Sequence, residues 1–153
     1  MNRNFLMFLC EAYEEQNVGT DGKDDYRTVL HLDPRLAPIT VAVLPLMKKD
    51  GLSEKAKEIQ HLLKEDFVTD FDTSGTVGKR YRRQDEVGTP FCVTVDYDTI
   101  QEKKEDGSEN PLFNTVTVRF RDSMEQERVS LDDLVFFIQK AIKNYKPVER
   151  TDR

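Results

Sequence analysis

The sequence predicts an α/β fold, a three-layer sandwich in which a five-stranded mixed sheet carries helices on both faces. Short apolar runs alternate with segments of helical periodicity between residues 39 and 97, as is typical of parallel strands joined by crossover helices. Residues 90–131 then hold three strand-like runs with no helical pattern between them, which indicates an antiparallel meander. An amphipathic helix closes the expected order β-α-β-α-β-β-β-α.

The first segment predicts a helix over residues 3–16, since it consists of good helix formers. Residues 5–10 are apolar on every side of this helix, a pattern of helices that are buried all round. Little else in the chain could surround them, so we expect a fragment whose first helix belongs in a larger protein. A local dimer contact is the alternative. Residues 17–26 predict an acidic linker, and residues 27–38 an extended connector.

The middle of the chain predicts two strands and two helices. Residues 39–44 form a continuous apolar run rich in β-branched residues, as expected of a central strand covered on both faces. Apolar residues recur at helical spacing over about 53–64, and residues 67–71 indicate a short strand. Residues 77–87 predict a second helix, which carries most of the basic residues discussed below.

The last third predicts a meander of strands at 90–97, 114–121 and 128–131, with a polar loop at 101–111. In the middle strand valines alternate with polar residues, so Arg119 and Arg121 are expected on its outward side.

The final helix is predicted from a capping-box-like start at Ser130 and Asp133, and from lysines that suit its C-terminal end. Its expected buried face consists of Leu131, Leu134, Val135, Ile138 and Ile142.

The composition limits the possible partners. The chain has 153 residues, a net charge of -6 and a pI near 5.0, which argues against a general DNA-coating or membrane-surface protein. Any contact with nucleic acid must therefore be local. Cys10 and Cys92 lack the spacing of a zinc or redox site and are expected to be reduced core thiols of a cytoplasmic protein. The apolar runs are too short to cross a membrane.

Residues 74–91 hold the densest group of cations in the chain. The group consists of Lys79, Arg80, Arg82 and Arg83 around Tyr81, followed by Gln84, Asp85 and Glu86. A solvated helix face is the ordinary interpretation of such a run. The flanking glycines, an aromatic ring that could stack on a base and the two arginines of the 114–121 strand favour single-stranded RNA instead.

Other motifs give no active site. The segment 75–79 has only two residues between its glycines and lacks the Ser or Thr after the lysine, so it is not a triphosphate-binding P-loop. Asp96 and Asp98 could form a catalytic or metal-binding pair, but strand-end residues are the simpler interpretation, and carboxylates beside arginines also suit the amino group of cytosine. His31 and His61 lack partners at ligand spacing. We therefore expect no catalytic residue and no metal site.

Four stretches carry a resemblance to a known family. They are residues 37–46, Asp72-Thr-Ser-Gly-Thr-Val-Gly-Lys-Arg-Tyr-Arg-Arg-Gln-Asp-Glu-Val-Gly-Thr-Pro-Phe91, residues 93–99 and residues 115–124. In this order they resemble the C-terminal anticodon-binding domain of glycyl-tRNA synthetases of the dimeric class II type. Residues 2–13 resemble the end of motif 3 in the catalytic domain of that family.

The resemblance implies a non-catalytic piece of a glycine–tRNA ligase, which attaches glycine to tRNA(Gly) using ATP. Residues 1–26 would be the end of the catalytic domain and a linker, 27–38 a connector, 39–146 the anticodon-binding domain and 147–153 a tail. The implied partners are the tRNA(Gly) anticodon loop, the catalytic domain of the same chain and, in the intact enzyme, a second subunit. ATP and Mg would bind only to the intact enzyme, where Arg3 would grip ATP.

The resemblance also implies roles in reading the two C positions of the anticodon. Lys79 and Arg121 would contact base edges and Tyr97 would stack. The phosphates or neighbouring bases would be held by Arg80, Arg82, Arg83 and Arg119, and the cytosine amino groups by Glu86, Asp96 or Asp98. The alternative is a stand-alone protein-interaction or accessory-subunit domain on the same fold.

Overall fold

The computed structural model describes residues 2–48 and 51–149. Within them lies a five-stranded sheet with the strand order β4-β3-β5-β6-β7. Strand β3 is parallel to β4 and β5, whereas β6 is antiparallel to β5 and β7. The strands are β3 (Val41–Pro45), β4 (Thr69–Phe71), β5 (Phe91–Val95), β6 (Thr115–Phe120) and β7 (Gln126–Ser130). The predicted mixed sheet is confirmed.

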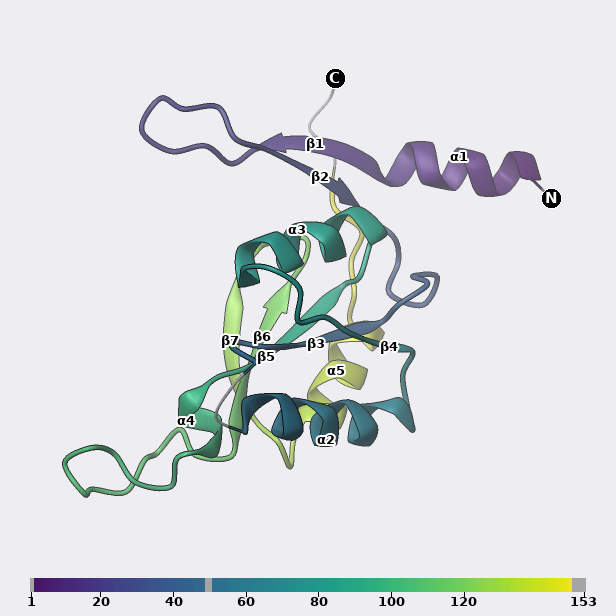
Figure 1. Cartoon of the computed structure of the whole chain (residues 1–153). Helices are drawn as coiled ribbons and strands as arrows, with labels where there is room; N and C mark the ends of the chain where they lie inside the picture. The colour runs from purple at the N-terminus through teal and green to yellow at the C-terminus, as the bar shows by residue number, and fades with distance from the viewer. Residues whose placement is uncertain (1, 49–50, 150–153) are drawn as a thin grey trace.

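Helices cover both faces of the sheet (Figure 1). On one face, α2 (Leu52–Lys64) and α5 (Leu134–Lys143) pack against the valines of β3, β5 and β6. This side is the apolar core, and β3 and β5 are buried along their whole length, as their continuous apolar runs predict. The three-layer sandwich is therefore confirmed.

The opposite face is covered by α3 (Val77–Val87), whose predicted bounds are those observed. Thr76 caps its first turn, and Gly88 ends it with a positive φ of 84°. The apolar contact beneath this helix is small and consists, within the described residues, of Ala42, Leu44 and Cys92 of the sheet packed against Tyr81. Burial raises the pKa of the Cys92 thiol to about 12. Hydrogen bonds and ion pairs fill the rest of this layer.

The predicted N-terminal helix is too long. Helix α1 (Asn2–Ala12) stops at Ala12, and the next residues form β1 (Tyr13–Asn17), which pairs antiparallel with β2 (Tyr26–Leu30). Pairing with a distant segment overrides the helix propensity of the acidic residues in β1. Strand β2 packs on the outer side of α3, so this hairpin adds a fourth layer (Figure 1).

Two further boundaries differ from the prediction. The predicted strand at 90–97 ends at Val95, because Asp96 caps the short helix α4 (Tyr97–Ile100) in a capping box with Thr99. Helix α5 begins only at Leu134, and its N-cap Asp133 makes no side-chain cap, so the predicted capping box at Ser130 and Asp133 is wrong. Asp133 has helical φ and ψ angles, unlike the extended backbone of residues whose side chains cap a helix.

Some predictions fall partly outside the described residues. The predicted tail at 147–153 is described only as far as residue 149, and residue 1 of the predicted first segment is outside as well. Across 2–48 and 51–149, no helix combines the length and apolar character needed to cross a membrane.

Candidate nucleic-acid interface

The carboxyl ends of the three parallel strands β3, β4 and β5 meet at one edge of the sheet, where ligands of open α/β sheets usually bind. The amide of Leu46 donates to the carbonyl of Val95 at 2.8 Å, which holds two of these strand ends together. Helices α3 and α4 begin at this edge. A hollow of about 550 Å³ lies here, lined by Leu46, Met47, Lys48, Thr73, Gly75, Thr76, Val77 and Arg80.

Lys79 is exposed near the start of α3, and its ammonium group pairs with no carboxylate of residues 2–48 or 51–149. Arg83 and Glu86 follow at helical spacing on the same side of α3. The Arg83 guanidinium is 43% exposed and donates to Asp72 at 2.6 and 2.9 Å. A phosphate could compete for such an accessible guanidinium, so these residues form the exposed polar face of α3.

Arg82 points in another direction. Its guanidinium donates to the carbonyl of Tyr26 at 2.8 Å and pairs with Asp25, both of which belong to the hairpin. Because the hairpin lies on the outer side of α3, Arg82 ties these two layers together. The exposed cations of the predicted basic cluster therefore point in two directions from α3.

Arg80 belongs to the interior. It is 3% exposed, and its terminal nitrogens donate to the carbonyls of Pro45 at 2.5 Å and Gly75 at 2.8 Å. Its neighbour Tyr81 shares a hydrogen bond of 2.6 Å with Thr94, and burial raises the pKa of this phenol. The idea that the Tyr81 ring lies ready to stack on a base is wrong, because the ring packs against the sheet.

Arg119 lies under α3 and does not face outward, so the prediction for this side of β6 is wrong. Its guanidinium makes two hydrogen bonds to Asp85, at 2.9 and 3.1 Å, and lies 4.7 Å from the centre of the Tyr81 ring. Arg27 of β2 approaches the same carboxylate at 3.1 Å. The pattern of β6 could not show that α3 and the hairpin cover its polar side.

Arg121 is the most deeply buried of the predicted contacts, at 1% exposed. It donates to the carbonyls of Gly88 and Leu32, both at 2.7 Å, and to the neighbouring Asp122. These bonds hold the end of α3 against the segment that follows β2. Arg121 was predicted to pair with a base edge, but it has no accessible donor with which to do so.

His31 and Asp122 extend this network, which the sequence did not indicate. The two ring nitrogens of His31 lie 2.8 Å from Glu14 of β1 and 2.6 Å from Asp122. Burial would raise the pKa of Asp122, but hydrogen bonds from His31 and Arg121 outweigh it and lower this pKa to about 2. This histidine links β1 to the body of the domain.

The structure brings Asp96, Tyr97 and Asp98 to the candidate edge. Burial opposes ionisation of Asp96, yet its ion pair with Arg128, at 2.5 Å, and its bonds from Thr99 lower its pKa below the ordinary value. The hydroxyl of Tyr97 donates to the Met47 sulfur at 3.2 Å. The carboxylate of Asp98 accepts from the Asn110 amide at 3.2 Å.

The carboxylates of this edge do not form a metal centre. Within the described parts of the chain, no group of three or more His, Cys, Asp or Glu is arranged to hold a metal ion.

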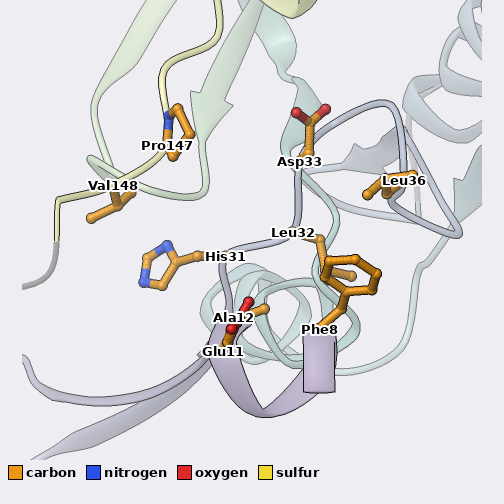
Figure 2. A pocket seen from close by; sticks show the side chains of 9 residues that line it. All are labelled: Phe8, Glu11, Ala12, His31, Leu32, Asp33, Leu36, Pro147 and Val148. Atoms are coloured by element: carbon orange, nitrogen blue, oxygen red, sulfur yellow. The ribbon is translucent and has the colours of Figure 1, made fainter. Parts of the chain in front are cut away.

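Helix α1 presents a second, apolar surface. It projects from the rest of the chain (Figure 1), and its side chains Phe5, Leu6, Met7 and Phe8 are 50–66% exposed. Arg3 is exposed on the same helix. A hollow of about 290 Å³ lies at its base. Figure 2 shows the side chains that line it. The lining residues are Phe8, Glu11, Ala12, His31, Leu32, Asp33, Leu36, Pro147 and Val148.

A mixed sheet with a helix beginning at the carboxyl edge of its parallel strands, and a polar face along that helix, defines a small α/β domain that presents exposed polar groups at one edge of its sheet. The chain belongs to the anticodon-binding domain family, whose model matches residues 40–141. It is 62% identical, over 95% of its length, to a glycine–tRNA ligase of Treponema denticola. Glycine–tRNA ligases of Clostridium perfringens and Rhodopirellula baltica are 52% and 51% identical over 93% of the chain. The chain spans only 25–30% of the length of these relatives.

Proposed function

We propose that the chain is the anticodon-recognition module of a glycine–tRNA ligase and carries no catalytic site of its own. The observation that carries this proposal is the 62% identity with one such ligase along 147 residues. The accessible polar groups at the carboxyl edge of the sheet support it, because exposed cations, an aromatic ring and carboxylates are the groups that read unpaired RNA.

We propose a role for each predicted RNA contact according to its exposure. We assign phosphate contacts to Lys79 and Arg83, stacking to Tyr97, and hydrogen-bond acceptance to Glu86 and Asp98, because these lie on the exposed side of α3 or at the strand ends. Other predicted residues would shape the site: Arg80, Arg119 and Arg121 from the interior, Arg82 through the hairpin and Asp96 as the cap of α4.

The projecting apolar helix supports a second part of the proposal. In a glycine–tRNA ligase, residues 1–26 would belong with the catalytic domain, 27–38 would connect, 39–146 would bind the anticodon and 147–153 would form a tail. Four large apolar side chains exposed on one helix are typical of a surface that another domain covers. The intact enzyme would work in the cytoplasm as a dimer, bind ATP and Mg, and hold ATP through Arg3.

The same exposed helix also favours an alternative function, that of a protein-interaction or accessory-subunit module. A measurement of RNA binding distinguishes this alternative from the anticodon-recognition module. We would titrate the chain with the tRNA(Gly) anticodon stem-loop and with a version whose two C positions are changed to U. We expect the change to weaken binding by about 5- to 150-fold for each position, since a mismatched base typically costs about 1–3 kcal/mol.

Two variants give the matched controls. Lys79→Ala should weaken binding without lowering the melting temperature, because Lys79 is exposed. Lys57→Ala removes an exposed lysine of α2, on the other face of the sheet, and should leave binding unchanged. Equal affinity for the C and U stem-loops would exclude anticodon reading, and no binding to either would favour the accessory-module function.

A further inference from the structure

We infer that the chain on its own forms a symmetric dimer in which the α1 helices of two copies pack antiparallel, with Met7 against Met7. The inference stands independently of RNA binding. In a longer protein, the domain proposed above to cover α1 would take the place of the second copy. Three features of α1 carry the inference.

The first feature is an apolar surface that the rest of the chain leaves open. Helix α1 projects from the sheet (Figure 1), and Leu6 and Met7 are 61% and 50% exposed. Cys10 is exposed as well. Side chains three and four residues apart share one side of a helix, so these three residues form a continuous stripe, here called the apolar stripe of α1. Contiguous exposed apolar surfaces mark sites of interaction.

The second feature is a pair of opposite charges at the two ends of the apolar stripe. Arg3 lies four residues before Met7 and Glu11 lies four residues after it, so all three share one side of the helix. Both charged side chains are exposed, and neither forms an ion pair with residues 2–48 or 51–149. A cation in the first turn and an anion in the last turn oppose the helix dipole, so the helix itself gains nothing from their placement.

The third feature is the symmetry of this arrangement. When two such helices pack antiparallel with their Met7 side chains in contact, Arg3 of each copy lies beside Glu11 of the other copy. Both ends of the contact then hold an ion pair, and the two apolar stripes cover each other. A two-fold dimer needs a surface that is complementary to itself, and the apolar stripe with its two charges meets this requirement. Parallel packing would instead place each charge against its like.

The other apolar residues of α1 lie on a different side of the helix. Ala12 is buried, and Phe8 lines the hollow at the base of the helix (Figure 2). Phe5 shares their side by helical spacing and is 66% exposed, as much as Leu6 of the stripe. Phe5 is therefore a matched control for the residues of the apolar stripe.

The first test is the oligomeric state of the unmodified 153-residue chain. Because α1 has only 11 residues, the contact is at the small end of specific interfaces, and we expect a dissociation constant in the micromolar range. Sedimentation equilibrium from about 5 to about 500 μM protein covers that range. A reducing agent is kept present, so that a disulfide between exposed Cys10 thiols cannot imitate the dimer.

Exchange of the charges tests the antiparallel register. Arg3→Glu places like charges against each other at both ends of the dimer, and Glu11→Arg does the same. Each change suits the helix dipole, so neither should unfold α1, which circular dichroism can check. We expect each variant alone to dimerise about tenfold more weakly. An equimolar mixture of the two restores both opposite-charge pairs and should form a heterodimer about as tight as the unmodified dimer.

Apolar substitutions test the position of the contact on the helix. Met7→Ser removes the side chain at the two-fold axis from both copies and should weaken the dimer about tenfold or more. Leu6→Ser should act in the same direction. Phe5→Ser removes an equally exposed apolar side chain from the other side of α1 and should leave the dissociation constant unchanged.

Each failure is distinct from a failure of the proposed function. A chain that stays monomeric over the whole concentration range refutes the dimer. A dimer whose charge variants associate no better in mixture than alone refutes the antiparallel register, and one that Phe5→Ser dissociates as strongly as Met7→Ser refutes the apolar stripe. Anticodon reading is decided separately, by the affinities for the C and U stem-loops.

Discussion

Asp85 is the residue on which the buried charges beneath α3 converge. Its carboxylate is 1% exposed and accepts from both Arg27 and Arg119, which come from the hairpin and from β6. Two guanidinium groups thus depend on one carboxylate in a site that water does not reach. The arrangement fixes the position of α3 between the sheet and the hairpin.

Replacing Asp85 by Asn should therefore be severe. The change leaves two buried guanidinium groups without a counter-charge, and removing one partner of a buried ion pair costs about 3–5 kcal/mol. Denaturant unfolding measures this loss directly. Asp132→Asn, on the exposed turn before α5, should change stability by less than about 0.5 kcal/mol. A similarly small effect at Asp85 would contradict the central place given to this carboxylate.

The carboxyl group of Asp122 should make the domain sensitive to acid. Its pKa is about 2 in the folded protein against 3.8 ordinarily, so its ionised form stabilises the fold above pH 4. That contribution, about 2 kcal/mol, is lost as the pH falls through 4 toward 2. We expect Asp122→Asn to be less stable at pH 7 and to lose less stability on acidification. Parallel stability curves for the two proteins between pH 6 and 2 would refute this role.

The orientation of individual side chains is also the feature that was predicted least well from the sequence. Arg119 and Arg121 alternate with valines and are predicted to face outward, yet both are buried. The carboxylate that neutralises Arg119 lies 34 residues away on α3. Arg27, the second partner of that carboxylate, lies in a segment predicted only as extended. Single-chain periodicity distinguishes apolar from polar faces, but it does not show which polar face another helix will cover.

At the scale of elements, α3 is defined by its two ends. Thr76 and Gly88 mark its start and its stop, and its predicted bounds are those observed. The hairpin of β1 and β2 could not be predicted, because its strands are short and polar. They are also separated by residues 18–25, which contain no two-residue turn signal. Its register depends on partners 9–17 positions away along the chain, which helix propensity does not contain.

Gly88 should tolerate no side chain. It has a positive φ, and a Cβ added there would lie 2.9 Å from the Leu32 side chain and 3.1 Å from the backbone oxygen of Leu30. We expect Gly88→Ala to cost about 1–2 kcal/mol for the left-handed backbone alone, with a further loss from this contact.

Gly107→Ala is the matched control for this prediction. Gly107 has a φ of 82° but nothing within 4 Å of its added Cβ, so it loses only the backbone contribution. Thermal unfolding of the two variants isolates the steric part. Equal losses would mean that β2 and α3 can move apart freely.

At the scale of the whole molecule, the net charge of -6 and the pairing of Arg80 and Arg82 within the chain limit RNA binding to a small patch. With Lys48, Lys79 and Arg83 as its accessible cations, the edge should contact about three phosphates. The logarithm of the affinity should then fall with the logarithm of salt with a slope of about -2, since each single-strand phosphate contributes about -0.7. A slope steeper than about -4 would require a larger basic surface.

The overall architecture could be predicted because it depends on alternation and element order, and the mixed sheet with helices on both faces is confirmed. The apolar run at residues 5–10 predicted a helix that is apolar on every side, and its side chains Phe5, Leu6, Met7 and Phe8 are exposed. The fourth layer was missed since it arises from packing of the hairpin on α3, which no local pattern encodes.

The two cysteines differ in a way that gives the chain a built-in labelling site. Cys10, predicted to be a core thiol, is instead exposed on α1, whereas Cys92 is buried beneath α3 with its thiol pKa raised to about 12. A thiol-reactive fluorophore attacks the accessible thiolate, so it should attach to the projecting helix and spare the interior. The colour or anisotropy of that dye would then report when a neighbouring domain covers α1, without any engineered substitution.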